Sequence, residues 1–170
     1  VLTEVVSYAC DIAKSKNRIV NFHLATNLEN MSQEKAAFLT RHNIAICTSC
    51  DGPPWLHDRN RPTKAGKSSF ANLSTWVPVL NKMYQENGYP TKVQALATIT
   101  RDSLAYPKEI VDTYLDLGFE SLFLRPLMPL GRASARVDHT PREFADFYRE
   151  VFWTIVDRSS SGARLTEAFA

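Results

Sequence analysis

Residues 43–62 read Asn-Ile-Ala-Ile-Cys-Thr-Ser-Cys-Asp-Gly-Pro-Pro-Trp-Leu-His-Asp-Arg-Asn-Arg-Pro, and this stretch predicts the fold. It opens with an apolar run rich in β-branched side chains, which is typical of a buried strand. The strand is expected to end abruptly at Asp51-Gly52-Pro53-Pro54, because proline fixes φ and removes a backbone donor. Aromatic, basic and acidic side chains crowd the residues that follow. Ligands of parallel α/β folds bind beyond the carboxyl ends of strands, so the stretch predicts a ligand site, with a charged surface loop as the alternative.

The length and composition predict one domain with a sizeable core. The chain has 170 residues, of which 44% are hydrophobic and 22% are charged. No apolar run approaches the length that spans a bilayer, so no membrane segment is expected. The formal net charge is only +2 and the basic residues are scattered, which argues against a nucleic-acid partner. The three cysteines form an odd count without a disulfide framework, which favours a reducing, cytoplasmic location.

Helical and extended patterns alternate along the whole chain. Apolar residues recur at helical spacing at the start of the chain, after Ser32, over residues 70–83, after Pro107 and after a capping box at Thr140. Regular alternation with short connections predicts a parallel sheet with crossover helices, either a barrel or a doubly wound sheet. A barrel needs about eight strands, so this α/β chain is expected to form an arc of one. The expected strands cover residues 18–27, 43–50, 93–100 and 121–124.

Polar side chains end each expected strand. Parallel strands bring their carboxyl ends to one edge of the sheet, so these side chains are expected to line a single mouth. Arginine forks match carboxylates and hydroxyls supply neutral hydrogen bonds, so the mouth favours an anionic or zwitterionic ligand. The alternative is that strand ends are polar because they reach solvent. The strand-end residues are Thr26 and Asn27, Ser49 and Asp51, Thr100 and Arg101, and Arg125.

Cys47 and Cys50 have the spacing of a redox or zinc Cys-x-x-Cys motif, but their position on a strand argues against both. Residues three apart on a strand point to opposite faces. Cys47 is therefore expected on the face of Ser49, and Cys50 on the face of Thr48. Redox and metal pairs need converging sulfurs, so both cysteines are expected to be structural thiols.

Three motifs occur in order: Thr26-Asn27-Leu28, then Thr48-Ser49-Cys50-Asp51-Gly52-Pro53, then Leu56-His57-Asp58-Arg59-Asn60-Arg61. Their order and spacing resemble the radical S-adenosylmethionine (AdoMet) enzymes of the SPASM, or anaerobic sulfatase-maturase, type. The later segments 97–104 and 117–127 are similar to the branch that serves as maturase of the His-Xaa-Ser peptide system. The resemblance covers nearly the whole chain. It implies a partial (β/α)6 barrel in which AdoMet is chelated by a [4Fe-4S] cluster on three cysteines of a CxxxCxxC loop.

The resemblance also implies roles for particular residues. Ser49 would hydrogen-bond the methionine or ribose part of AdoMet, Asp51 would fix the turn after its strand, and the backbone of the strand at Leu124 would meet the adenine. Arg125 and Arg101 come from the mouth argument as candidates for the cofactor carboxylate or the peptide substrate. The predicted cofactor-binding set is Ser49, Asp51, Thr26, Asn27, Leu124, Arg125 and Arg101.

The chain also departs from the family pattern, because neither CxxxCxxC nor Gly-Gly-Glu-Pro occurs in it. Both are expected upstream in a longer protein, and a cysteine-rich domain is expected downstream. Residues 1–158 are thus expected to form the central and C-terminal part of the partial barrel, and residues 159–170 a hinge toward the missing domain. The three cysteines lie on separate elements or opposite faces, so we expect no metal site in this chain and no activity of the fragment alone.

Three functions remain open. The first is the core of a radical AdoMet maturase that generates a 5′-deoxyadenosyl radical and takes hydrogen from a ribosomally synthesised peptide. The second is a cluster-free barrel that acts as a peptide-binding or scaffolding module. The third is another α/β barrel enzyme acting on an anionic small molecule, although no glycine-rich phosphate loop is present. An arc of a barrel exposes apolar edges, so self-association of the fragment is also expected.

Overall fold

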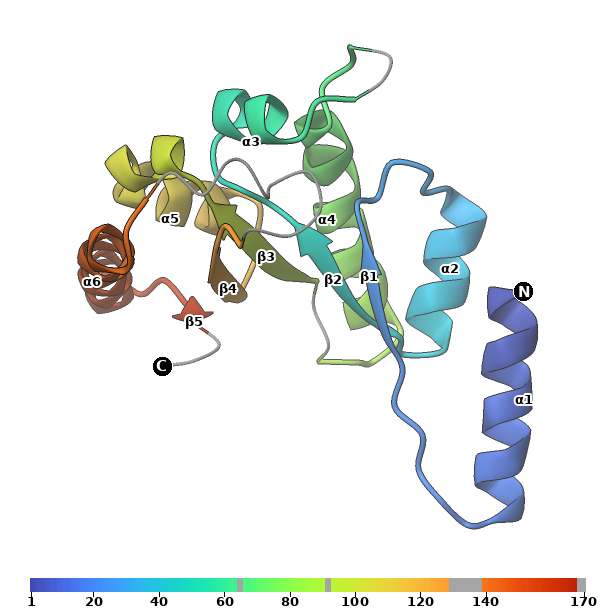
Figure 1. Ribbon diagram of the computed structural model, residues 1–170. Coiled ribbons are helices and arrows are strands. Elements are labelled where there is room, and N and C mark those ends of the chain that lie inside the picture. Colours follow the sequence, from blue (N-terminus) through green and yellow to red (C-terminus); the bar gives the residue numbers. More distant parts are fainter. Residues whose placement is uncertain (64–65, 91–92, 129–138, 168–170) are drawn as a thin grey trace.

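The computed structural model describes residues 1–63, 66–90, 93–128 and 139–167, and helices and strands alternate along them as predicted (Figure 1). A 3₁₀ helix, η1 (Arg101–Ala105), follows the third strand. The strands are β1 (His23–Thr26), β2 (Ala45–Ser49), β3 (Gln94–Ile99), β4 (Ser121–Pro126) and β5 (Thr166–Glu167). The helices are α1 (Leu2–Ser15), α2 (Gln33–Arg41), α3 (Pro54–Asn60), α4 (Phe70–Glu86), α5 (Pro107–Asp116) and α6 (Pro141–Ser160).

The strands of the described residues form one parallel sheet in the order β1-β2-β3-β4-β5 (Figure 1). The spatial order follows the chain order without the reversal that defines a doubly wound sheet. The predicted arc of a barrel is therefore confirmed over the doubly wound alternative.

The segment 159–170, predicted as a hinge, also contributes to the sheet. It begins with the last residues of α6 and then adds β5, where Thr166 pairs with Ser121 and Glu167 with Leu122 of β4. A strand of two residues carries no readable periodicity, which is why four strands were expected and a fifth was not. Whether this segment leads to a further domain stays a prediction.

Helix starts follow the signals in the sequence. The Ser32 hydroxyl accepts the Lys35 N–H (3.3 Å), and Thr140 and Glu143 form the expected capping box of α6. The loop expected after β2 differs, because it contains the short helix α3. Pro54 opens this helix, and proline is tolerated there because the first helical N–H needs no partner within the helix.

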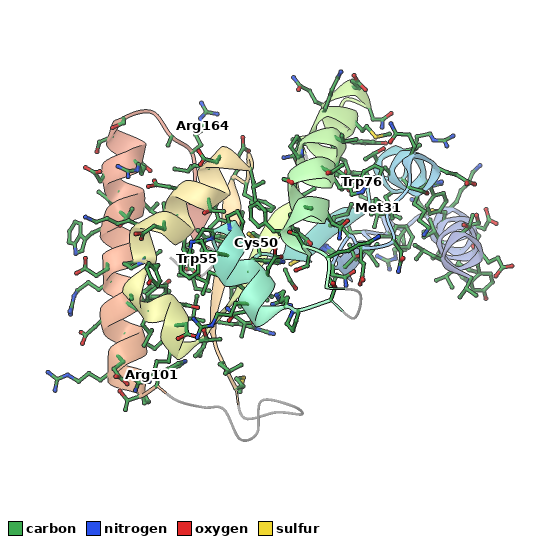
Figure 2. The ribbon with its side chains drawn as sticks, turned by 90° about the horizontal axis from the view of Figure 1, so that it is seen from above. Met31, Cys50, Trp55, Trp76, Arg101 and Arg164 are labelled. Atoms are coloured by element: carbon green, nitrogen blue, oxygen red, sulfur yellow. The ribbon has the colours of Figure 1, made fainter. Side chains whose placement is uncertain are left out.

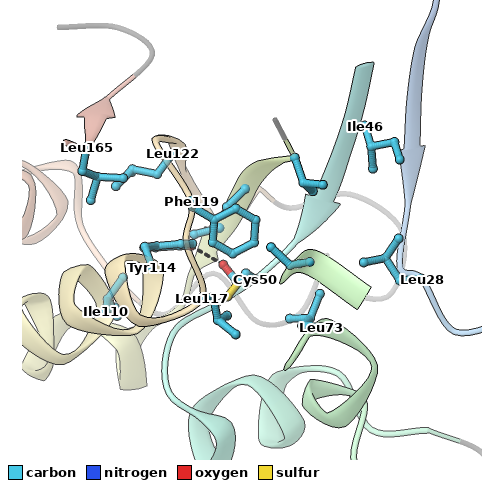
Figure 3. Close-up of a cluster of buried hydrophobic side chains, with 14 of the residues drawn as sticks. Leu28, Ile46, Cys50, Leu73, Ile110, Tyr114, Leu117, Phe119, Leu122 and Leu165 are labelled. Carbon is cyan, nitrogen blue, oxygen red and sulfur yellow. Dashed lines mark hydrogen bonds between the residues drawn. The ribbon is translucent and has the colours of Figure 1, made fainter. Parts of the chain in front are cut away.

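Alternate residues of the strands face the helices and build the core (Figure 3). Ile46 of β2, Ala97 of β3 and Leu122 of β4 are fully or almost fully buried there. The opposite side of the sheet is here called the open face, since its residues keep partial or full exposure. These residues are Cys47 and Ser49 of β2, Leu96 and Thr98 of β3, and Phe123 and Arg125 of β4.

Two buried tyrosines hold both ends of β2. The Tyr84 hydroxyl of α4 donates to the Ile44 carbonyl before the strand, and the Tyr114 hydroxyl of α5 donates to the Cys50 carbonyl after it (Figure 3). Burial raises the pKa of both phenols above the ordinary value, so both remain donors at neutral pH. The helix layer thereby sets the position of β2, and with it the position of Ser49.

Candidate ligand site at the carboxyl edge of the sheet

Asp51, directly after β2, is the best-connected carboxylate of this edge. Its side chain is 1% exposed. It accepts two hydrogen bonds from Arg61, from Nε at 2.7 Å and from Nη2 at 3.0 Å, and a third from the Thr98 backbone N–H at 2.9 Å. A charge-assisted, bidentate contact of this kind is strong and directional. Asp51 thus joins the end of β2 to β3 and to the residue that follows α3.

Asp51 occupies a place that a strand carbonyl would otherwise take. The Cys50 N–H still donates to the Leu96 carbonyl (3.0 Å), and a continuing parallel ladder would next join the Thr98 N–H to the Cys50 carbonyl. That carbonyl instead accepts the Tyr114 hydroxyl. The Asp51 carboxylate satisfies Thr98, so β2 leaves the sheet while β3 continues to Ile99.

His57 of α3 binds the backbone of the same turn. It is buried, and its Nδ1 accepts the Asp51 N–H at 3.2 Å. Burial lowers the pKa of His57, the Asp51 carboxylate partly raises it, and the Arg61 guanidinium lowers it. The neutral ring is therefore the form that the fold requires.

We expect the free energy of unfolding to fall as the pH drops below about 6.5, the ordinary histidine pKa. In that range the unfolded chain takes up a proton that folded His57 refuses, so stability is fully present above it and is lost toward the lowered folded pKa, at up to about 1.4 kcal/mol per pH unit. Urea unfolding between pH 7.5 and 5 measures the slope. His57→Asn keeps an acceptor without titrating there and should flatten it, while His42→Asn, at an exposed position, should not. Equal slopes in wild type and His57→Asn would contradict this assignment.

The other charged residues of α3 also have defined partners. The Asp58 carboxylate accepts the Phe70 N–H (2.8 Å) and the Ser69 hydroxyl (2.9 Å), which caps the start of α4. Arg59 pairs with Asp102 of η1 at 2.8 Å. The alternative of a merely solvated charged loop therefore does not describe residues 51–61, because their side chains build the edge of the sheet.

The open face beside this turn presents groups that a ligand can use. Ser49 and Phe123 lie in one row across β2, β3 and β4, with Leu96 between them, and Thr98 pairs with Arg125 one step further along. Adjacent strands are roughly 4.8 Å apart, so a small ligand can span this row. Leu96 and Phe123 offer apolar contact, and the other three offer hydroxyl and guanidinium donors.

The Arg125 side chain is directed back over the open face. Its guanidinium carbon lies 5.3 Å from the centroid of the Phe123 ring, as a cation–π contact. Burial raises the pKa of the Cys47 thiol, and the charge of Arg125 acts in the opposite direction. Cys47 is on β2, the strand that also carries Ser49, so the charge of Arg125 has an electrostatic effect on that strand.

The arginines at this edge differ in their partners. Arg61 is held by Asp51, Arg59 by Asp102, and Arg101 by Glu143 of α6 at 3.3 Å. Figure 2 shows Arg101 beside the start of α6, away from Cys50 at the end of β2. Within the described ranges, Arg125 has no carboxylate partner. The structure thus separates the two predicted arginines, with Arg125 on the open face and Arg101 in an ion pair with α6.

Three further predicted site residues have local contacts of their own. The Thr26 hydroxyl accepts the Leu28 N–H (3.2 Å) and the Asn27 side chain accepts the Glu29 N–H (3.2 Å), which stabilises a turn where Leu28 has φ +60°. The Leu124 side chain is buried on the helix side, and its N–H donates to Glu167 Oε1 at 3.4 Å. Their roles in ligand binding stay predictions.

Sequence reasoning missed Arg61, Phe123 and Glu167. Arg61 was quoted within a motif, but its partner Thr98 is 37 residues away, and no local pattern joins the two. Phe123 reads as an ordinary strand residue. Glu167 is buried, accepts the Tyr148 hydroxyl at 2.6 Å, and lies in a segment without periodicity.

The cysteines do not fit an iron–sulfur cluster. Cys10 is on α1, Cys47 is on the open face and Cys50 is on the opposite face, as predicted. Burial raises the pKa of Cys50 to about 12, which disfavours the thiolate that a metal needs. In the part of the chain that the structure describes, no group of three or more Cys, His, Asp or Glu residues is placed to hold a metal ion.

The fold has clear relatives among solved structures. The structure of anSMEcpe with bound AdoMet and Kp18Cys peptide superposes with a TM-score of 0.77 at 16% identity, covering 98% of this chain and 46% of that one. This is the fold of the anaerobic sulfatase-maturating enzymes. Streptococcus suis SuiB bound to its precursor peptide SuiA gives a TM-score of 0.67 at 13% identity, covering 87% of this chain and 31% of SuiB. The predicted fold, an arc of the partial barrel of these enzymes, is confirmed.

Sequence comparison agrees with the sulfatase-maturase resemblance. The Clostridium novyi cysteine-type anaerobic sulfatase-maturating enzyme is 23% identical over 141 residues, which are 81% of this chain and 36% of that enzyme. An uncharacterised protein of Synechocystis sp. is 28% identical over 132 residues, 75% of this chain and 31% of that protein. No protein-family model matches. The chain thus spans about a third of the curated relatives it matches, and similarity to the His-Xaa-Ser branch stays a prediction. None of the helices described here is long and apolar enough to cross a membrane.

Proposed function

We propose that this chain is the core of a radical AdoMet maturase that modifies a peptide or protein. The observation that carries the proposal is the open face, where Ser49, Thr98 and Arg125 lie around the apolar side chains of Leu96 and Phe123. Its fold is shared with anSMEcpe, whose structure holds AdoMet and a peptide, and with SuiB, whose structure holds its precursor peptide. A ribosomally synthesised peptide is accordingly the proposed substrate.

The open face fits AdoMet by its chemistry. AdoMet carries a carboxylate, for which a guanidinium is the matched donor, and an adenosyl group, for which apolar and aromatic contacts are suitable. In this proposal Arg125 binds the carboxylate, Ser49 donates to the methionine or ribose part, and Asp51 keeps both strands in place. When reductively cleaved, bound AdoMet supplies the 5′-deoxyadenosyl radical that removes hydrogen from the substrate. Because the three cysteines do not converge, a [4Fe-4S] cluster would need ligands from outside these residues.

The cluster-free alternative rests on that same cysteine arrangement. A barrel wall with an open, partly apolar face and no cluster ligands of its own could bind a peptide without chemistry. In either case the free thiols Cys10, Cys47 and Cys50 suit a reducing cytoplasm, and self-association of the isolated chain stays an expectation that light scattering checks.

The deciding experiment measures 5′-deoxyadenosine made by the full-length protein after anaerobic reconstitution with iron and sulfide. Loss of a hydrogen bond to a charged group costs about 1.5–3 kcal/mol, so Arg125→Ala should lower AdoMet turnover at limiting AdoMet by roughly 10- to 150-fold. Ser49→Ala removes a neutral donor and should lower it several-fold. Arg101→Ala, the paired arginine at the same edge, should leave turnover close to wild type.

Two results would count against the proposal. Equal turnover in wild type and Arg125→Ala would remove AdoMet from the open face. A protein shown to carry its cluster that makes no 5′-deoxyadenosine, even with a candidate peptide, would favour the binding-module alternative.

A further inference from the structure

Arg61 is held at the rim of the open face, and its contacts leave part of its side chain exposed to solvent. Its side chain is 32% exposed. Nε and Nη2 bind the Asp51 carboxylate, and Nη2 also lies 3.4 Å from the Thr98 hydroxyl. The Thr98 side chain is on the open face, so the guanidinium reaches that side of the sheet.

Thr98 is the residue on which these contacts converge. Its N–H donates to Asp51 Oδ1, and its hydroxyl oxygen accepts from Arg61 Nη2. Thr98 also pairs in register with Arg125 of β4. Before Thr98 along β3, the Leu96 carbonyl accepts the Cys50 N–H. After it, the Ile99 carbonyl accepts the Leu127 N–H at 2.9 Å. Between these two points Asp51 connects the end of β2 to β3 through the Thr98 N–H, because the Cys50 carbonyl accepts the Tyr114 hydroxyl instead.

We propose that Arg61 is a positioning residue of the open-face site: by holding Asp51 and Thr98 it sets the end of β3, and through Thr98 the place of Arg125 on the open face. The inference rests on the proposed function, since the ligand that Arg125 binds is AdoMet in that proposal. A side chain at residue 61 that is neutral, or that donates from a single nitrogen as lysine does, would let the Asp51 carboxylate rotate. The Thr98 amide would then lose its fixed acceptor. Arg125 would then sample more orientations over Phe123 and bind a carboxylate less well.

The chain contains a matched control. Arg158 of α6 binds Asp112 of α5 through Nε at 2.7 Å and Nη2 at 3.0 Å, the same bidentate geometry as Arg61 with Asp51. That pair joins two helices and includes no open-face residue. Lysine keeps the charge but lacks the planar fork, so Arg61→Lys and Arg158→Lys remove the same chemistry at two places.

The test measures AdoMet dissociation constants by equilibrium dialysis on the full-length, cluster-loaded protein, at a temperature where every variant is folded. We expect Arg61→Lys to weaken AdoMet binding about three- to tenfold and Arg158→Lys to change it less than twofold. In an Arg125→Ala background, Arg61→Lys should have no further effect, because Arg61 acts through Arg125. Hydrogen exchange of the Thr98 amide should be faster in Arg61→Lys and unchanged in Arg158→Lys.

Different failures have different meanings. If wild type binds AdoMet and Arg61→Lys binds it equally well, the positioning role is overturned while the proposed function stands. If the effect of Arg61→Lys persists in the Arg125→Ala background, Arg61 touches the ligand itself and the positioning role is again overturned. If the cluster-loaded wild type binds no AdoMet, the proposed function fails and the ligand part of this inference fails with it, whereas the Thr98 exchange rate still reports whether Arg61 holds β3.

Discussion

Arg61→Ala will lower the free energy of unfolding by about 3–5 kcal/mol, because it leaves the Asp51 carboxylate buried without its counter-ion. Asp51 is 1% exposed and has two of its hydrogen bonds from Arg61, so water cannot easily replace them. The Thr98 N–H remains as one donor, which is too little for a buried charge. Urea denaturation at pH 7 measures the loss.

Arg158→Ala tests whether burial of the carboxylate accounts for the loss of stability in Arg61→Ala. The Arg158–Asp112 pair has the same distances, but both side chains are about 40% exposed, at 39% and 43%. Water and ions screen such a pair, so its removal should cost a small fraction of the loss at Arg61. Similar losses in the two variants would show that the Asp51 carboxylate is not buried as the structure has it.

Gly52→Ala will destabilise the protein by about 3 kcal/mol or more, from two causes that act together. Gly52 has φ +124°, a conformation that residues with a Cβ rarely adopt and that costs roughly 1–3 kcal/mol. A Cβ placed there would also lie 2.8 Å from Ile110 Cγ1 and 3.3 Å from Leu56 Cδ2, and overpacking adds about 1–3 kcal/mol. Thermal and urea unfolding of the variant measure the sum.

Gly88→Ala separates the two causes. Gly88 also has a positive φ, +76°, but a Cβ there would have no atom within 4 Å, so only the backbone cost applies. In addition, Gly52→Ala combined with Ile110→Ala should cost less than the sum of the two single substitutions, because the new methyl group enters the space that Ile110 leaves. Equal losses for Gly52→Ala and Gly88→Ala would argue against the close approach of α5 to this turn.

The sequence motif around residue 51 reports on architecture as much as on ligand binding. Asp51, His57, Asp58 and Arg61 all bind other parts of the chain. Together they end β2, hold β3 and start α4. Ser49 precedes this turn and lies on the open face, where a ligand can reach it.

Much of the fold was predictable because it follows from local periodicity. The alternation of exposed and buried residues along β2 placed Cys47 and Cys50 on opposite faces, as the period of two requires. The capping box at Thr140 marked the start of α6. Strand β5 was missed because two residues show no period, and α3 was missed because seven residues between prolines read as a loop.

The candidate site was predictable only in outline. The sequence indicated that polar side chains meet at one sheet edge, and parallel pairing brings those strand ends together. It did not distinguish Arg101 from Arg125, since both follow strands. The difference lies in Glu143, 42 residues beyond Arg101, which pairs with one and leaves the other on the open face.

The sequence by itself determined the order of helices and strands, the direction of the sheet and the face on which each strand residue lies. These properties depend on interactions between residues a few positions apart, and their periods of 2 and 3.6 are visible in the chain. Only the tertiary structure decided that Asp51 binds Thr98, 47 residues away, and that Arg101 binds Glu143, 42 residues away. Such contacts depend on which distant segments the packed helices bring together, and side-chain partners across that distance leave no periodic trace.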